Sequence, residues 1–328
     1  MKIYHLGVLG VAGHFIGAVL PPLLQSKTVQ VYGIASRDGE KAAEAARQYG
    51  IPKSYASYQA LLEDPAIDLV YIPLPNHLHA EWIKKCADYG KHVICEKPLT
   101  MNAAEAREAL DYARAKGVRV MEAFMYRFHP QWRRALEIVK FHGIGALTGI
   151  HTFFGYSNKD PHNIRNIKET GGGAIYDIGC YAVSTARFLM QGEPQRVLGL
   201  ANYDPCFQTD ILVNGVLDFG GIRTLFTVAT QTFPFQKVEV YGTNGVMTVE
   251  IPFNMYPDCP AQLTVRNGVG SRTVQLGPAD QYQLEFEEFV AAIAAGRETP
   301  IAPEDAVCNM KVLDALYRSA RTGEWENV

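Results

Sequence analysis

The chain has 328 residues, of which 48% are hydrophobic and 20% charged, and its formal net charge is -3 at pH 7. This length allows two domains with a sizeable core, and the weak negative charge gives no electrostatic support for a nucleic-acid or anionic-membrane partner. The six cysteines are scattered without metal-ligand spacing, and no signal peptide precedes the first predicted strand. We therefore expect reduced thiols in a cytoplasmic protein without a membrane-spanning segment.

A strand, a glycine-rich turn and a helix are predicted at the start of the chain. The apolar residues 4–9 lead into Gly10-Val11-Ala12-Gly13-His14-Phe15, and another apolar segment follows. Dinucleotide-binding folds begin this way, because glycines let backbone N–H groups approach a pyrophosphate at a helix N-terminus. Since Ala12 stands where the second glycine usually lies, an ordinary strand-to-helix turn remains an alternative. The pattern predicts cofactor contacts at Gly10, Ala12, Gly13, His14 and Phe15.

The second predicted strand, residues 29–35, ends in Ser36-Arg37. An acid at this place usually binds the ribose 2′-hydroxyl of NAD, whereas an arginine suits the 2′-phosphate of NADP. We expect Ser36 and Arg37 to bind the cofactor and favour NADP. Asp38, one residue further on, keeps NAD as an alternative.

Strands and helices alternate as far as residue 123. A helix over residues 40–49 ends at Gly50, and a buried strand over 68–72 precedes a loop and a helix over 80–89. A strand, a helix over 102–116 and a strand over 118–123 follow, so we predict an α/β domain with a doubly wound parallel sheet over residues 1–123. Loop residues at the strand ends are expected to bind the cofactor, namely Leu74, Asn76 and His79. Although His77 and His79 lie close in sequence, no third ligand accompanies them, and we predict no metal.

The buried segment Val93-Ile94-Cys95 ends in Glu96-Lys97-Pro98. An unpaired ammonium is costly inside a strand, and Pro98 cannot continue the sheet ladder. Lys97 is therefore placed at the carboxyl end of a parallel strand, where open α/β sheets bind ligands. A surface Glu–Lys pair is the alternative.

The second half of the chain has a different pattern. Residues 126–130 open a helix, and most segments from residue 147 onward are extended and joined by short glycine turns, which predicts hairpins in a large, mainly antiparallel sheet. A helix over residues 174–190 interrupts these strands, and two helices, 281–295 and 303–322, close the chain. We predict an α+β domain for substrate binding and oligomerisation over residues 124–328, whose closing helices are candidates for packing back on the first domain.

The interrupting helix places Asp177 and Tyr181 four residues apart, on one face. Asp177 lies near the first turn, where the helix macrodipole favours a carboxylate. A core tyrosine with a bonded hydroxyl remains the alternative for Tyr181.

Four ordered motifs together resemble the Gfo/Idh/MocA oxidoreductases. They are the N-terminal glycine turn, Glu96-Lys97-Pro98, the stretch Glu122-Ala123-Phe124-Met125-Tyr126-Arg127-Phe128-His129-Pro130, and Gly171-Gly172-Gly173-Ala174-Ile175-Tyr176-Asp177-Ile178-Gly179-Cys180-Tyr181. Within the family, Tyr181 and the Tyr-Arg-Phe-His-Pro stretch are similar to the dimeric dihydrodiol dehydrogenase and NADP-dependent D-xylose dehydrogenase branch. The resemblance implies a Rossmann domain, a sheet that often mediates dimers, and a Lys-Pro bond that is frequently cis.

The resemblance implies an NADP-dependent dehydrogenase acting on a sugar, polyol or cyclic diol, with Tyr181 as acid/base. A lysine ammonium close to a phenol lowers its pKa from about 10, and we assign this role to Lys97. Asp177 is expected to hold the lysine or bind a substrate hydroxyl. Glu96 and Arg127 complete the predicted cofactor contacts, and Tyr126, His162 and Arg165 the predicted substrate contacts.

Two other functions stay open at this stage. One is a glucose-fructose type oxidoreductase that never releases its cofactor, although the N-terminal arm and export signal of that type are missing from this sequence. The other is an NADP-sensing binding protein without turnover, which would have no need of Lys97, Asp177 and Tyr181 together. As partners we expect a small-molecule substrate and a second copy of the chain, in a homodimer or a higher homo-oligomer.

Overall fold

The computed structural model describes residues 2–328 and divides them into two compact units. The first contains residues 2–124 and Tyr282–Val307, and the second contains Met125–Gln281 and Cys308–Val328. The chain thus leaves the first unit one residue after the boundary expected from the sequence and returns to it for most of helix α8 (Gln281–Ala294) and the start of helix α9 (Pro303–Thr322). No helix in the described part of the chain is long and apolar enough to cross a membrane.

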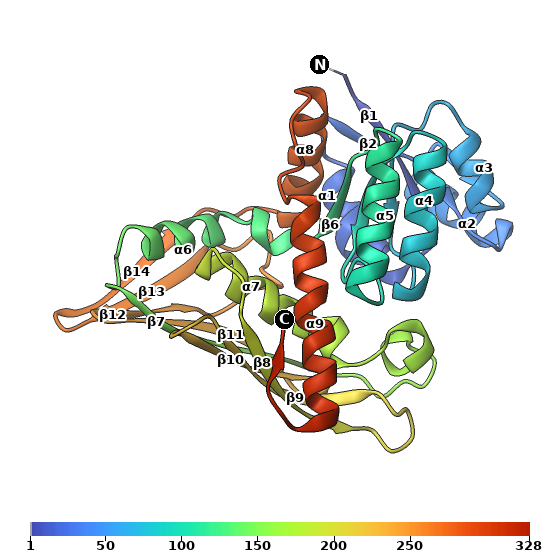
Figure 1. Cartoon of the computed structure of the whole chain (residues 1–328). Coiled ribbons are helices and arrows are strands. Elements are labelled where there is room, and N and C mark those ends of the chain that lie inside the picture. The colour runs from blue at the N-terminus through green and yellow to red at the C-terminus, as the bar shows by residue number, and fades with distance from the viewer. Residues whose placement is uncertain (1) are drawn as a thin grey trace. The chain divides into compact units, whose positions relative to one another are not determined.

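A parallel six-stranded sheet forms the centre of the first unit, in the order β3-β2-β1-β4-β5-β6. Its central strands are mostly apolar and buried because helices cover both faces of the sheet (Figure 1), the usual situation of a parallel sheet, whereas the edge strand β3 is largely exposed. The predicted doubly wound α/β sheet is confirmed. The strands are β1 (Tyr4–Leu9), β2 (Val29–Ala35), β3 (Lys53–Tyr55), β4 (Leu69–Ile72), β5 (His92–Glu96) and β6 (Val120–Ala123).

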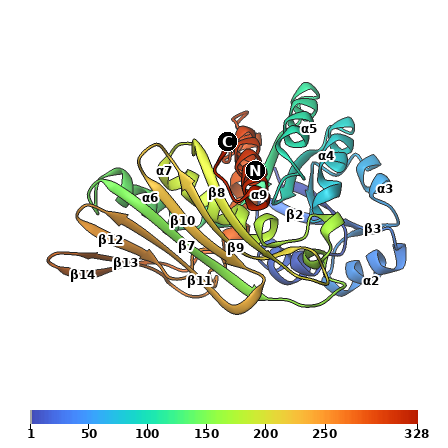
Figure 2. The same ribbon diagram turned by 60° about the horizontal axis from the view of Figure 1, so that its bottom comes forward.

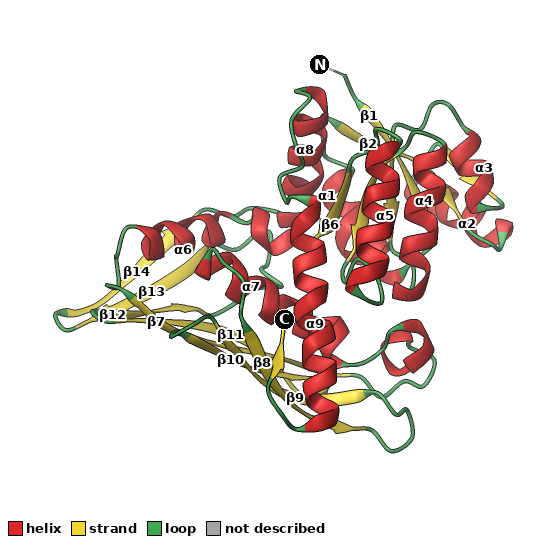
Figure 3. Ribbon diagram, viewed as in Figure 1, coloured by secondary structure: helices red, strands yellow, loops and turns green. Residues whose placement is uncertain are grey.

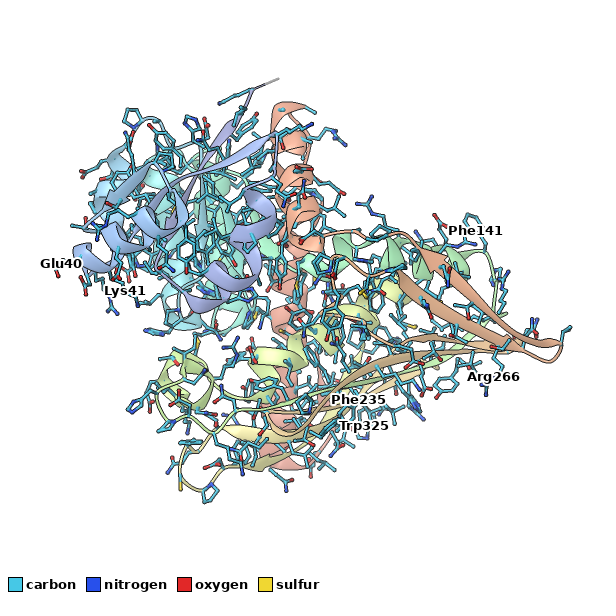
Figure 4. The ribbon with its side chains drawn as sticks, turned by 180° about the vertical axis from the view of Figure 1, so that it is seen from behind. Glu40, Lys41, Phe141, Phe235, Arg266 and Trp325 are labelled. Carbon is cyan, nitrogen blue, oxygen red and sulfur yellow. The ribbon has the colours of Figure 1, made fainter. Side chains whose placement is uncertain are left out.

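Three helices of this unit begin at side-chain caps that satisfy their first N–H groups. Asp38, Ser57 and Asn102 accept backbone N–H groups at the starts of α2, α3 and α5, and Gly50 closes α2 with a φ of 67°. Figure 4 shows Glu40 and Lys41 in the first turn of α2. The helices are α1 (Leu20–Leu23), α2 (Gly39–Tyr49), α3 (Tyr58–Glu63), α4 (His79–Asp88) and α5 (Ala103–Ala115).

The second unit contains a nine-stranded sheet in the order β14-β13-β12-β11-β7-β10-β9-β8-β15 (Figure 2). Within the described residues β7 and β10 pair in parallel, and the other neighbours pair antiparallel, so the predicted mainly antiparallel sheet is confirmed. The strands are β7 (Leu147–Ser157), β8 (Arg196–Tyr203), β9 (Asp210–Asp218), β10 (Arg223–Ala229), β11 (Gln231–Gly242), β12 (Gly245–Val249), β13 (Ala261–Asn267), β14 (Gly270–Leu276) and β15 (Glu326–Asn327).

The extended pattern of residues 223–232 is divided between two strands. Strand β10 ends at Ala229 and β11 begins at Gln231. The buried Thr230 between them donates its N–H to Ile211 O (2.9 Å) and accepts the N–H of Asn158 (2.9 Å). Thr230 thus still bonds to β9 and to the residue after β7, and the chain turns there and continues as β11, which pairs with the other edge of β7.

Helices cover one face of the large sheet, and its other face is open. Helices α6 (Pro130–Lys140) and α7 (Cys180–Met190) and the second half of α9 lie on the covered face (Figure 3). Side chains alternate accordingly along β10, where Phe226 and Val228 are buried and Leu225 is 43% exposed. On β11, Phe235 is 48% exposed, and its ring contacts Phe153 of β7 with centroids 5.6 Å apart. The open face therefore carries apolar side chains.

Candidate active site

The turn after β1 has the conformation that a pyrophosphate-binding turn needs. Gly10 has a φ of 110°, which favours glycine, and its N–H donates to Ala35 O (2.8 Å). Helical backbone begins at Gly13, so the first N–H groups of this helix have no partner within it. A Cβ added to Gly13 would meet no atom within 4 Å. The residues therefore leave room for a diphosphate and offer donors to it, which fits a dinucleotide cofactor.

The first helix differs from the regular one that the sequence suggests. Residues Phe15–Val19 form a π-helical turn, and α1 that follows is the single turn Leu20–Leu23. Pro21 and Pro22 have no N–H to donate to the preceding turn, so regular hydrogen bonding is interrupted where the π-helical turn meets α1.

At the end of β2, the side chains of Ser36, Arg37 and Asp38 have different surroundings. Arg37 is exposed and has no ion-pair partner among residues 2–328. Asp38 is occupied as the N-cap of α2, where its Oδ1 accepts the N–H groups of Glu40 (3.0 Å) and Lys41 (3.2 Å). Ser36 is buried, and its Oγ accepts the N–H of Asp38 (3.1 Å).

Tyr58 joins this group, and sequence reasoning missed it. Burial raises the pKa of Tyr58, while the charge of the Arg37 guanidinium and a hydrogen bond from it act in the opposite direction. The Tyr58 hydroxyl also lies 3.7 Å from where a Cβ of Gly10 would be. Tyr58 of α3 therefore lies between the turn at Gly10 and the side chain of Arg37. In the sequence, only the N-cap residue Ser57 could have indicated this short helix.

His79 connects the loops that follow β4 and β5. It is fully buried, with Nε2 2.7 Å from Leu74 O and Nδ1 3.0 Å from Pro98 O. Because both ring nitrogens of His79 lie next to backbone carbonyl groups, the side chain positions the two loops and offers no ring nitrogen to a ligand. Leu74 is buried against the glycine turn, with Cδ2 3.4 Å from a Cβ built on Gly10, and Asn76 begins the single 3-10 turn before α4.

Glu96 lies at the end of β5 in a buried polar group. The Tyr71 hydroxyl donates to its Oε1, and His14 Nε2 is 3.7 Å from the same oxygen. Glu285 of α8 is buried nearby, and burial together with the Glu96 charge raises the pKa of Glu285 well above its ordinary value. Neither Tyr71 nor Glu285 was expected here, since they lie far from Glu96 in sequence.

Lys97 follows β5 directly and is half-buried. The Lys97–Pro98 peptide bond is cis, as the resemblance implied. The next N–H, that of Leu99, donates to Glu122 Oε1 of β6 (2.8 Å). The backbone on which Lys97 sits is thus fixed from two sides, by Glu122 and by His79.

In the second unit, Asp177 collects two donors. Its Oδ2 accepts the hydroxyl of Tyr156 (2.6 Å) and Nε of Arg165 (3.0 Å), and the residue is 9% exposed. Burial and the Asp177 charge raise the pKa of Tyr156 far above its ordinary value. The predicted site residues Arg165 and Asp177 are therefore in contact. Tyr156 of β7 also belongs to this group, although the alternation of buried and exposed side chains along a strand could not have indicated its contact with Asp177.

Tyr181 is surrounded by aromatic rings. It is 6% exposed, its hydroxyl donates to Met125 Sδ (3.3 Å), and its ring centroid lies 5.1 Å from that of Phe253 and 5.8 Å from that of Tyr126. Residues Ile175–Gly179 form a π-helical turn before α7 begins at Cys180, so the predicted helix over 174–190 is not α-helical throughout.

The other predicted substrate and cofactor contacts in this unit have different surroundings. Tyr126 is fully buried and shares a hydrogen bond with Ser184 Oγ (2.7 Å). Arg127 places its guanidinium 4.8 Å from the ring centroid of Phe188. His162 is exposed on a loop, where its N–H donates to Asp160 Oδ1 (2.9 Å). No group of three or more His, Cys, Asp or Glu side chains among residues 2–328 could hold a metal ion.

Two family models match consecutive parts of the chain. Residues 4–124 match the Gfo/Idh/MocA oxidoreductase family model with an NAD-binding Rossmann fold, and residues 132–248 match the Gfo/Idh/MocA C-terminal domain. The chain belongs to the Gfo/Idh/MocA family of oxidoreductases. Its first unit is accordingly an NAD(P)-binding Rossmann domain, and the glycine turn fits that cofactor.

Relatives in this family act on sugars and diols. The chain is 39% identical to a D-xylose 1-dehydrogenase (NADP(+)) from Haloferax volcanii, over 97% of each protein. It is 35% identical to a trans-1,2-dihydrobenzene-1,2-diol dehydrogenase from Xenopus tropicalis, over 69% of this chain and 68% of the relative. A 3-ketoreductase from Actinomadura kijaniata, crystallised with NADP and TDP-benzene, superposes with a TM-score of 0.91 at 27% identity, over 97% of this chain and 98% of that one. The similarity to the xylose and dihydrodiol dehydrogenases expected from the motifs is confirmed.

Proposed function

We propose that the protein is an NADP-preferring dehydrogenase that oxidises a CH–OH group of a sugar, a polyol or a cyclic diol. The observation that carries the proposal is the contact of Asp177 with Arg165 and Tyr156, one helical turn before Tyr181. A carboxylate, a guanidinium and a phenol at one place supply both acceptors and donors for hydroxyl groups. Such a set suits a substrate with several hydroxyls.

In this mechanism Tyr181 takes the proton from the reacting hydroxyl. Lys97 has two roles: its ammonium lowers the pKa of the Tyr181 phenol, and it orients the reacting hydroxyl. When bound, the nicotinamide supplies the hydride acceptor. The apolar rings around Tyr181 keep water from the phenol, which strengthens the effect of a nearby positive charge.

The remaining predicted residues take supporting roles in the proposal. Arg165 and Asp177 bind substrate hydroxyls, with His162 at the exposed edge of the same loop. Because Tyr126 is buried beneath Tyr181, we assign it to holding that ring rather than to contacting substrate. Arg37 and Ser36 bind the 2′-phosphate, while the turn Gly10–Phe15, with Ala12, binds the pyrophosphate. Arg127, Glu96 and the loop of Leu74 and Asn76 line the cofactor site.

Two further parts of the proposal rest on the same observations. The open apolar face of the nine-stranded sheet supports a homodimer, since a second copy would cover it. None of the six cysteines forms a disulfide among the described residues, which suits a cytoplasmic protein, and that location remains a prediction.

The proposal is tested by following NADPH absorbance at 340 nm with aldoses, inositols and trans-diols, each with NADP and with NAD. We expect turnover with at least one hydroxylated substrate and a higher kcat/KM with NADP than with NAD. A protein that binds NADP but turns over no member of the panel in either direction would instead be a cofactor sensor. Cofactor that copurifies and never exchanges would indicate the glucose-fructose type.

A further inference from the structure

A cavity lies within the second unit, and its walls do not include the residues assigned to catalysis. Its volume is about 1080 Å³, which is large enough for a small molecule. Helix α9 lines it with Asp314, Tyr317, Arg318 and Arg321, whose spacing places them on one helix face. The loop between β8 and β9 and the segment before α7 form the remaining walls, and none of Asp177, Tyr181, Arg165 and Tyr156 lines it.

The floor of this cavity contains a polar atom that the protein leaves unsatisfied. Thr209 is 3% exposed, and its Oγ1 has no hydrogen-bond partner among the described residues. Because this oxygen is itself buried, the Thr209 side chain must rotate toward the cavity before a ligand atom can bond to it, and the bond would then remove the cost of an unpaired buried hydroxyl. Tyr176 and Tyr317 form an aromatic wall with ring centroids 4.7 Å apart, and such rings pack well against the face of a sugar-sized molecule.

The cavity is lined by three basic residues and three acidic ones, namely Lys168, Arg318, Arg321, Asp204, Asp210 and Asp314, and two of the basic residues form no ion pair within the described chain. Asp210 already accepts the N–H of Ile175 (2.6 Å) and the hydroxyl of Tyr317 (3.2 Å). Asp204 accepts Nε2 of Gln231 (2.8 Å) and two backbone N–H groups. By contrast, Lys168 and Arg321 have no ion pair among residues 2–328.

We propose that this cavity binds a small polyhydroxylated anion, a sugar acid or a sugar phosphate. Its negative group lies against Lys168 and Arg321, and one of its hydroxyls bonds to Thr209. Gly172 and Tyr176 of the cavity belong to the segment that leads into Asp177 and Tyr181, and Asp210 holds the N–H of Ile175 in that segment. The ligand therefore contacts the element that carries the proposed catalytic residues.

The test is isothermal titration of the full chain with D-gluconate, D-glucose 6-phosphate and, as the uncharged counterpart, D-glucose. We expect at least one anion to bind, at least tenfold more tightly than glucose, and to bind more weakly as ionic strength rises. The double variant Lys168→Gln/Arg321→Gln should lose about tenfold or more in affinity, and Thr209→Val should lose several-fold. Lys311→Gln removes an exposed charge of α9 outside the cavity and should bind as the wild type does.

The relative strength of the two anions identifies the preferred group, carboxylate or phosphate. The proposal is wrong if neither anion binds up to about 10 mM, or if binding is unchanged in both Lys168→Gln/Arg321→Gln and the cavity-filling variant Ala320→Phe. Because binding is measured without turnover, the absence of anion binding would not contradict the proposed dehydrogenase activity. Equally, the absence of dehydrogenase activity would not contradict anion binding in this cavity.

Discussion

Arg37 is the residue on which the cofactor preference depends. It is exposed, it has no acidic partner among residues 2–328, and its charge acts on the pKa of Tyr58, which lies beside the glycine turn. Asp38, which could have favoured NAD, is used to cap α2 instead. The guanidinium of Arg37 is therefore available to pair with a phosphate, whereas the carboxylate of Asp38 is used to cap a helix.

Replacing Arg37 should affect one cofactor and not the other. Arg37→Ala removes a charge-assisted bond to the 2′-phosphate, so NADP affinity should fall by about 1.5–3 kcal/mol while NAD affinity stays nearly constant. Fluorescence titration with both cofactors measures this, and Arg47→Ala, an exposed arginine on α2, is the control. Equal losses for NADP and NAD would contradict the assignment.

Single residues were predictable where local sequence rules apply. Gly10, Lys97 and Asp177 could be placed because a glycine turn, a strand end and a helix start are each visible in a few consecutive residues. Tyr58, Tyr71, Tyr156 and Glu285 could not, because each reaches its partner through tertiary packing between segments distant in sequence. Tyr126, a predicted substrate contact, is fully buried with its ring centroid 5.8 Å from that of Tyr181, and its motif alone could not indicate this burial.

The segment Ile175–Met190 is the element that carries both Asp177 and Tyr181, and Asp210 fixes its start. Asp210 of β9 is 2% exposed, and its Oδ2 accepts the Ile175 N–H (2.6 Å). Burial raises the pKa of Asp210 to about 6, although the hydrogen bonds from Ile175 and Tyr317 oppose that shift. A Cβ on Gly173 would lie 2.1 Å from Asp210 Oδ1, so this glycine lets the carboxylate approach the helix start.

The raised pKa of Asp210 gives a pH dependence of stability. The folded carboxyl holds its proton up to about pH 6, whereas the unfolded one loses it near 3.8, so its contribution is fully present below 3.8 and is lost as the pH rises through 6. Asp210→Asn removes this titration. Between pH 4.5 and 7.5, the unfolding free energy of the wild type should therefore fall by about 2 kcal/mol relative to the variant.

Urea denaturation at several pH values measures this difference. A parallel pH dependence of the two proteins would show that Asp210 does not titrate in this range. The amide oxygen introduced by Asp210→Asn can still accept the Ile175 N–H, so the substitution preserves the contact while removing the charge.

Elements were predictable where apolar periodicity is long and glycine or proline marks the ends. The helix over residues 40–49 and the hairpins at residues 219–221 and 242–245 match the structure closely. Short elements such as β3 and α3 were missed because three to six residues carry too little periodicity. The parallel pair of β7 and β10 was not predicted, because strand order depends on packing that no local pattern encodes.

For the whole molecule, the open face of the nine-stranded sheet is the main unexplained surface in the single chain. Leu225 lies opposite Val216 of β9, and Val216 opposite Leu198 of β8, so apolar side chains run across three strands. Phe235 adds an exposed ring on β11, labelled in Figure 4. Sheets with one apolar face require a cover, and a second copy of the chain is the simplest one.

We expect the wild type to be a homodimer, or a higher assembly built from it, at micromolar concentration. Leu225→Arg combined with Phe235→Glu places charges on the open face and should yield monomers in light scattering after size-exclusion chromatography. Val269→Glu, which changes a 98% exposed side chain at the turn between β13 and β14, should leave the mass unchanged. A monomeric wild type would refute the dimer.

The central claim is that Tyr181 is the acid/base of a dehydrogenase and that Lys97 both lowers its pKa and orients the reacting hydroxyl. Lys97 belongs to the first unit and Tyr181 to the second, so their pairing is tested best by function. Lys97→Met should reduce turnover as much as Tyr181→Phe or more, and should move any remaining alkaline limb of the pH profile upward. The loss of turnover in the double variant should be far smaller than the two single losses combined, since the two residues act as a unit.

The most direct measurement is kcat of Tyr181→Phe beside its NADPH affinity from fluorescence titration. Loss of the proton acceptor should lower kcat by roughly 10²–10⁴-fold, and cofactor affinity should stay close to that of the wild type. A Tyr181→Phe enzyme that keeps more than about a third of the activity would contradict the account, and the proton would then have to pass to Lys97 or Asp177.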